Sequence, residues 1–142
     1  MSNNASARVL TVIDDEECFA LLGTQTFGRL AVLRDGRPEI FPVNYALDGR
    51  TIIIRTASGV KLDYGSFAHV AFEVEQIDPQ TREGWVVEFK GFAEEVTDGA
   101  DAWSVHARDA APDPWVQGPH EHVLAVRSGQ VSGRRLSIRA SD

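Results

Sequence analysis

Five residues near the middle of the chain could together hold a phosphate group. They lie in the segment IIRTASGVKLDYGSF, where an apolar run is followed by a turn and then by a stretch typical of a helix. Arg55 offers a planar fork of donors and Lys61 a point charge. Thr56 and Ser58 add hydroxyl groups. A helix that begins after Gly59 has unpaired N–H groups at its start, so the segment predicts an anchor for a phosphorylated ligand. The alternative is that both cations are solvated and Ser58 only caps the helix.

A second feature, PVNY, places a proline inside a predicted strand. Pro42 has no backbone N–H, so the strand has a free edge, a bulge or a ligand beside it. The irregular backbone of Pro42, Val43 and Asn44 could hydrogen-bond a flat heteroaromatic ring, with Tyr45 next to it. The alternative is an edge strand in which Tyr45 packs inside a barrel.

Two tryptophans and two arginines form a third group of candidates. Trp85, at the start of GWVVEFKG, could stack on a ring or lie at a subunit interface, although a lone tryptophan is more commonly core packing. Trp115 lies in the proline-rich segment AAPDPWVQGP. Arg134 and Arg135 are neighbours on a predicted strand, so they point to opposite faces. At most one of them reaches an anion, and the other is solvated or paired with an acid.

Other kinds of chemistry find little support in the sequence. His120 and His122 could share a strand face, but no third ligand, cysteine pair or HExxH motif accompanies them, and we expect no metal site. The single cysteine, Cys18, cannot form an intramolecular disulfide, and we expect it in the core. No Ser-His-Asp set can be assigned, and the glycines form no dinucleotide-binding fingerprint.

The elements that must position these residues are mostly short strands. Asp35-Gly36 and Asp48-Gly49 are hairpin turn signals that join three strands into a meander, and Gly91 suggests a bulge. Six or seven strands with two or three short helices predict a small antiparallel barrel. The predicted strands are 27–34, 39–47, 51–56, 69–77, 84–96, 121–131 and 134–139, and the predicted helices run from Asp14 or Asp15 to before Gly23, over 58–67, and over 100–110 with Asp98 as its cap.

Length and charge set the broad class of protein. The chain has 142 residues, enough for one domain, and we expect a tail over 1–13, the domain over 14–139 and a short tail over 140–142. Its net charge of -7 argues against binding of nucleic acid or anionic membranes. The N-terminus lacks an apolar signal core, and no apolar run approaches the ~18–20 residues that span a bilayer. We therefore expect a cytoplasmic protein.

With these motifs in hand, the chain resembles the pyridoxamine 5'-phosphate oxidase-like family of split-barrel flavoproteins, in particular its short single-domain members. The resemblance covers roughly residues 14–138 and rests on the order and spacing of FGRLAV, PVNY, IIIRTASGVK, VAFEVE, GWVVEFKG with AEEV behind it, and VSGRRL. It implies a mainly β fold, a six-stranded antiparallel split barrel with flanking helices. It also implies a homodimer with two flavin sites at the interface and a small-molecule substrate.

Carried over by position, the resemblance implies an FMN site and an FMN-dependent oxidoreductase. Arg55, Thr56 and Lys61 would hold the phosphate, together with the turn at Ser58 and Gly59. The isoalloxazine ring would lie along Pro42, Val43, Asn44 and Tyr45. The partner subunit or the substrate pocket would contribute Trp85, Trp115, Arg134 and Arg135.

Two departures from the family pattern limit the substrate and the cofactor contacts. Members of this type commonly carry a polar residue after the tryptophan of the GW motif, where this chain has Val86. The C-terminal arginine and histidine pattern of the true oxidases is absent from SGRRLSIRASD, which argues against pyridoxamine phosphate as the substrate. The alternatives are an F420-dependent reductase, a non-catalytic flavin-binding or haem-binding protein with His69 or His120 as haem ligand, and a barrel with an empty site.

Overall fold

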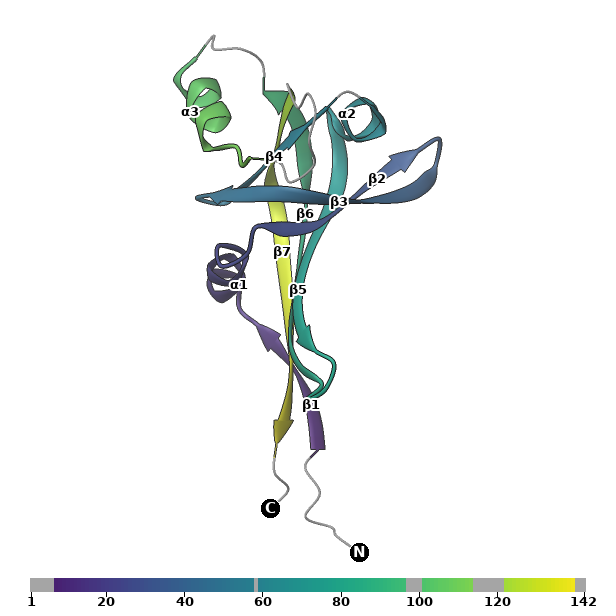
Figure 1. Ribbon diagram of the computed structural model, residues 1–142, viewed down its shortest axis with the longest axis vertical. Helices are drawn as coiled ribbons and strands as arrows, with labels where there is room; N and C mark the ends of the chain where they lie inside the picture. The colour runs from purple at the N-terminus through teal and green to yellow at the C-terminus, as the bar shows by residue number, and fades with distance from the viewer. Residues whose placement is uncertain (1–6, 58, 97–100, 114–121, 140–142) are drawn as a thin grey trace, which may run out of the picture.

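Antiparallel strands account for most of the chain in the computed structural model, which describes residues 7–57, 59–96, 101–113 and 122–139 (Figure 1). Within these ranges the chain forms seven strands and three helices. In chain order the elements are β1 (Ala7–Ile13), α1 (Asp15–Leu22), β2 (Phe27–Arg34), β3 (Arg37–Asp48), β4 (Thr51–Thr56), α2 (Val60–Gly65), β5 (Ala68–Asp78), β6 (Glu83–Val96), α3 (Ala102–Ala110) and β7 (His122–Arg139).

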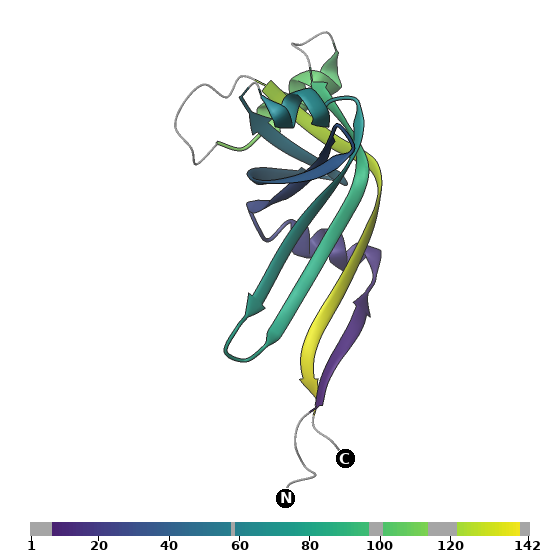
Figure 2. The same ribbon diagram turned by 90° about the vertical axis from the view of Figure 1, so that its right-hand side faces the viewer.

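Six of these strands close into a barrel. The strand order is β1-β7-β4-β3-β2-β5-β6, and a further pairing of β7 with β6 closes the ring, which leaves β1 outside it as an added strand on β7. The predicted fold, a mainly β, six-stranded antiparallel barrel with flanking helices, is confirmed. β5, β6, β7 and β1 continue beyond the barrel as a twisted ribbon, seen from the side in Figure 2.

The meander of the first three barrel strands follows the predicted turns. Asp35 and Gly36 have φ values of 52° and 79°, both in the left-handed region that a two-residue hairpin turn requires. β3 pairs with β2 over 37–44 and with β4 only over 45–48. On the side away from β2, the described residues thus leave the edge of β3 at Pro42 unpaired. The free edge that Pro42 predicts is therefore present.

The last barrel strand is longer than expected, and the N-terminal segment is ordered against it. The sequence predicts a break at Ser132-Gly133, which is wrong. It also predicts a tail over 1–13, of which residues 7–13 instead form β1. β7 runs without a break and pairs with β1 from Ala7↔Arg139 to Ile13↔Gly133. Gly133 serves close packing, because a Cβ there would lie 2.6 Å from the Cys18 sulfur. The bulge predicted at Gly91 is confirmed as a register shift between Lys90 and Phe92.

Each helix covers one part of the barrel. α1, capped by Asp14, packs against β7 and β6, and Cys18 and Leu22 on it are buried as part of the core. α2 is shorter than the predicted 58–67 and contacts β2, β5, β6 and β7 at the upper end of the barrel in Figure 1. The cap of α3 is Asp101, whose carboxylate accepts from the N–H of Ser104, and the predicted cap Asp98 lies outside the described residues.

The apolar residues form two clusters on opposite sides of the sheet. The larger fills the barrel and extends under α1, with Tyr45, Phe72 and Phe89 among its fully buried side chains. The smaller lies between α3 and the outer side of the barrel, and it includes Ile53 and Val123. No helix in the described ranges is both long enough and apolar enough to cross a membrane.

Candidate functional site

The predicted phosphate anchor lies at the upper end of the barrel, where β4 ends and α2 begins. Thr56 is the last residue of β4 and is only 1% exposed, and its hydroxyl donates to the carbonyl of Ala57 at 3.1 Å. Gly59 has a φ of +143°, which favours glycine and allows the sharp entry into α2. Ser58 lies outside the described residues. α2 has only six residues, so the N–H groups at its start are weak support for a phosphate site. Side chains would have to bind the phosphate.

Lys61 is the charged group that suits an anion best. Its ammonium lies 5.8 Å from the centre of the Phe41 ring, which places it beside the free edge of β3. The residue is half-buried, and burial lowers the pKa of Lys61 from its ordinary value because desolvation penalises the charged form. Among the described residues, no carboxylate lies within ion-pair distance of it. An anionic ligand would relieve that penalty.

Arg55 does not join Lys61, contrary to the sequence prediction. Its Nε donates to the carbonyl of Pro112 at 3.2 Å and its Nη2 to that of Arg108 at 3.4 Å, both at the C-terminal end of α3. The reason is strand alternation. Thr56 follows the parity of Ile54 in the barrel core, whereas Arg55 follows Ile53 towards α3. Two adjacent residues that look like one cluster in the sequence therefore face opposite sides of β4.

The PVNY segment divides in the same way. Pro42 is exposed and Asn44 half-exposed on the outer side of β3, while Val43 and Tyr45 point into the barrel. The Tyr45 hydroxyl donates to the carbonyl of Leu22 at 2.5 Å, and burial raises the pKa of Tyr45. Its side chain is thus barrel packing, not a cofactor contact. The backbone at the free edge and the side chain of Pro42 could contact a ring, while the Asn44 amide donates to the carbonyl of Thr26 at 3.5 Å.

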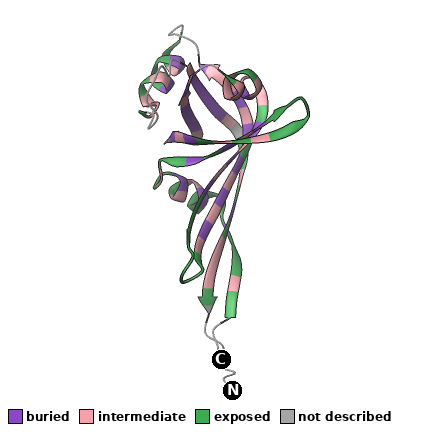
Figure 3. Ribbon diagram, turned by 45° about the vertical axis from the view of Figure 1, so that its right-hand side comes forward, coloured by how far each residue is buried: buried purple, intermediate pink, exposed green. Residues whose placement is uncertain are grey.

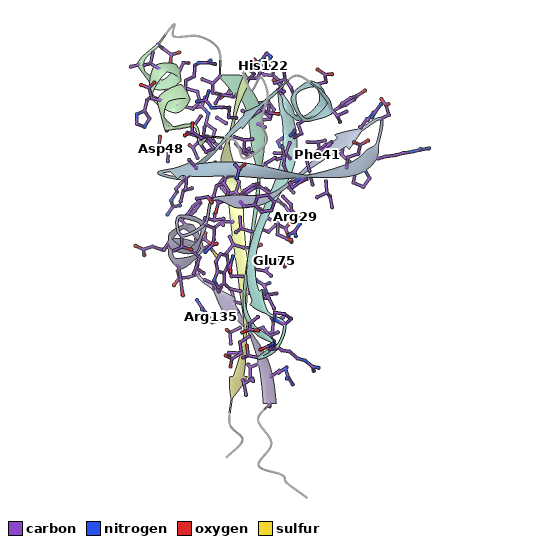
Figure 4. The ribbon with its side chains drawn as sticks, in the orientation of Figure 1. Arg29, Phe41, Asp48, Glu75, His122 and Arg135 are labelled. Atoms are coloured by element: carbon purple, nitrogen blue, oxygen red, sulfur yellow. The ribbon has the colours of Figure 1, made fainter. Side chains whose placement is uncertain are left out.

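The third group of candidates lies far from the predicted phosphate anchor within one chain. On β6, Trp85 is eleven residues before Val96, which is level with the end of β4, so the separation is roughly 35 Å at the usual rise per residue. Figure 4 shows Arg135 in the lower half of the molecule and His122 near its upper end. Trp115 falls outside the described residues.

The side chains of this third group have different surroundings. Trp85 packs in the main core, so stacking on a ligand is not its role in the single chain. Arg135 pairs with Glu17 of α1, which confirms that one of the two arginines is neutralised by an acid. Arg134 lies on the opposite, outer face of β7, exposed, and donates to the carbonyl of Gly133 at 3.0 Å.

The sequence analysis did not find two features of the upper end of the barrel, near Lys61 and Thr56. Phe41 contacts Lys61, and the only signal for it is its place beside Pro42. His122 pairs with Glu95, with Nδ1 and Oε2 2.6 Å apart, and His122 is in register with Thr56 on the next strand. A contact between residues 27 positions apart cannot be read from local pattern. Three metal-ligating side chains do not come together anywhere in the described part of the chain.

Comparison with known proteins establishes the family. The family model described as pyridoxamine 5'-phosphate oxidase matches residues 14–135, and the chain belongs to this family. It is 31% identical over 137 residues to the uncharacterized protein Rv0080 of Mycobacterium tuberculosis, covering 92% of this chain and 88% of that one.

Solved structures agree with this assignment. An FAD-binding protein from Mesorhizobium loti superposes with a TM-score of 0.74 at 27% identity, covering 92% of this chain and 99% of that one. An FAD-binding protein from Mycobacterium smegmatis superposes with a TM-score of 0.67 at 28% identity, covering 89% and 98%. The family predicted from the order of the sequence motifs is confirmed.

Proposed function

We propose that this protein binds a flavin nucleotide, FMN, with the phosphate at Lys61 and Thr56 and the ring along the free edge of β3. The observation that carries the proposal is Lys61, a half-buried cation beside that edge with no carboxylate partner among the described residues. The two FAD-binding relatives support a flavin as the ligand. A phosphate monoester suits one ammonium and one hydroxyl, and the acidic balance of the chain favours FMN over the longer anionic tail of F420.

The residues of the chain would hold and orient the ring and would not act as nucleophiles. Pro42 and Asn44 lie on the outer side of β3, where a ring could contact their side chains, and the peptide groups of the free edge could hydrogen-bond its polar rim. Bound flavin would supply hydride transfer, so we propose an oxidoreductase acting on a small molecule.

A homodimer is part of the proposal, because the outer side of the sheet carries many apolar side chains and, among the described residues, α3 covers only its upper end. This outer face is the side of β1, β7, β6, β5, β2 and β3 that points away from the barrel interior. Figure 3 shows exposed residues around the β2–β3 hairpin and along much of β1. A groove of about 500 Å³ on it is lined mainly by apolar residues such as Ala31 and Leu33. The exposed large apolar residues on the outer face are Leu10, Val12, Phe27, Leu33, Ile40 and Ile77.

A second copy on this face would bring new side chains to the flavin site. Pro42 and Asn44 lie on the outer face together with Arg134, which is in register with Val86 and Val12. Within one chain Arg134 is remote from Lys61, so it could reach a flavin only from the partner. Trp85 could not, since it points into the core.

The experiment that tests this proposal is a fluorescence titration of FMN into the protein and into the variant Lys61→Met. Loss of one charge-assisted contact of about 1.5–3 kcal/mol predicts FMN affinity that is weaker by roughly ten- to a hundredfold. The control is Arg37→Met, which removes one positive charge from an exposed position at the β2–β3 hairpin and should leave the affinity unchanged. Equal affinity in the protein and both variants would remove Lys61 from the site.

A further inference from the structure

Three neighbouring strands place a polar row at the upper end of the barrel. Thr56 of β4 is in register with His122 of β7, and Glu95 of β6 reaches His122 with its carboxylate, 2.6 Å from Nδ1. The two side chains of this pair are each 30% exposed. His122 has the strand parity of Leu124, and Glu95 that of Ala93, both in the barrel core. The row therefore faces the inside of the barrel mouth, beside the residue proposed to contact the phosphate.

The other charged side chains at this end of the barrel lie on the opposite face of the sheet or belong to α2. On β4 and α3, Arg55 and Arg108 donate to backbone carbonyls on the α3 side of the sheet. On α2, Lys61 is half-buried and Asp63 is exposed. On β6, Glu94 pairs with Arg127 beside Trp103, on the opposite face from Glu95. The charge nearest to Thr56 from the described strands is therefore that of the His122–Glu95 pair.

We propose that the His122–Glu95 pair makes binding of the flavin phosphate depend on uptake of a proton. The inference rests on the proposed flavin site. With a neutral imidazole the pair carries one negative charge, and with an imidazolium it carries none. A phosphate at Thr56 and Lys61 is repelled by the first state and not by the second, so binding favours the protonated pair. Histidine is in general the side chain whose charge changes near neutral pH, which sets the range of the test below.

The pH dependence that the pair predicts for FMN binding is opposite to the one expected from ionisation of the phosphate itself. A phosphate monoester gains its second negative charge near pH 6, which by itself would tighten binding to Lys61 as the pH rises. The His122–Glu95 pair should have the reverse effect. Repulsion between its screened negative charge and the nearby phosphate should lower the FMN affinity roughly tenfold between about pH 6 and pH 8.5. Riboflavin has no phosphate, so its affinity should not follow this dependence.

Two substitutions of the pair should act in opposite directions. Glu95→Gln removes the negative charge, so FMN binding should tighten at pH 8.5, while a fall with pH should remain because a proton on His122 still adds one positive charge. His122→Gln leaves the charge of Glu95 uncompensated across the tested range, so binding should weaken at pH 6 and should no longer fall as the pH rises. A purely structural role for the pair would weaken binding in both variants.

The test is a set of fluorescence titrations of FMN and riboflavin between about pH 6 and pH 8.5 for the protein and both variants. Calorimetric titration of the unaltered protein in two buffers of different ionisation enthalpy adds a direct count of protons taken up with FMN. We expect proton uptake with FMN, none with riboflavin, and opposite shifts in the two variants. FMN binding without proton uptake, or with the same pH profile in all three proteins, would overturn the inference while leaving the flavin site intact. Absence of FMN binding at every pH would reject the proposed function and this inference with it.

Discussion

Single residues at this site are sorted by the alternation of strands more than by their chemical type. Arg55 and Thr56 are adjacent, yet one holds the end of α3 and the other faces the barrel interior beside His122. The same alternation separates Arg134 from Arg135, and there the sequence predicted the outcome, because both lie within one predicted strand. For Arg55 the strand was predicted as well, but its partners are the carbonyls of Arg108 in α3 and of Pro112 just after it, more than fifty residues later in the chain.

Gly133 offers a prediction at the scale of one residue. Replacing it with alanine places a Cβ 2.6 Å from the Cys18 sulfur, so Gly133→Ala should lower the free energy of unfolding by about 1–3 kcal/mol through overpacking. Thermal or urea unfolding measures the change. The double variant with Cys18→Ala makes room for the added methyl and should recover part of the loss relative to Cys18→Ala alone. If the double variant recovers nothing, the clash with Cys18 is not the cause.

At the scale of elements, the strands were predicted best. β2 and β4 have the predicted bounds, because alternating apolar residues and Asp-Gly turns mark them locally. β1 was missed because its partner is β7 at the other end of the chain, and its burial pattern is mostly exposed. The break expected in β7 came from Gly133, whose role is close packing against Cys18 and not a turn.

α3 depends on contacts with side chains from several strands. Arg55 binds two carbonyls at its C-terminal end, Asp48 at the end of β3 lies 2.7 Å from Nε2 of His106, and the Arg127 guanidinium lies 3.9 Å from the centre of the Trp103 ring. These contacts hold the helix over the smaller apolar cluster. Arg55 also complements the negative end of the helix.

We therefore predict that Arg55→Ala loosens α3. Loss of about 2 kcal/mol of charge-assisted hydrogen bonding should speed amide hydrogen exchange in α3 roughly thirtyfold, with little change in the barrel strands. The control is Arg50→Ala, whose guanidinium lies over the Phe19 ring of α1. Unchanged exchange in α3, together with weaker FMN binding, would instead return Arg55 to the phosphate site.

At the scale of the whole molecule, the outer face links the fold to the proposed site. The barrel interior is filled, α1 and α3 cover parts of the sheet, and the remaining outer face exposes a row of large apolar side chains. Exposed apolar side chains set among charged residues such as the Arg29–Glu75 pair suit the interface that we propose. The sequence predicted a dimer only through the family resemblance, because an apolar outer face becomes visible only when distant strands are placed side by side.

Ile40 tests the role of this face. Ile40 is 65% exposed on it, so Ile40→Asp should shift the protein from dimer to monomer in light scattering and weaken FMN binding at the same time. Val105→Asp is the matched control, since Val105 is 47% exposed on α3, away from the outer face, and should change neither property. A protein that is already monomeric, or a dimer that survives Ile40→Asp with full flavin affinity, would contradict the proposed interface.

The central claim is that the free edge of β3 and Lys61 form a flavin site, and one spectroscopic titration tests it most directly. The absorbance and fluorescence of the purified protein would be recorded alone and after addition of FMN, FAD, F420 and haemin. We predict saturable binding of FMN with a perturbed flavin band, tighter than that of F420 or haemin. Saturation by F420 or haemin without FMN binding, or no binding of any of the four, would contradict the claim.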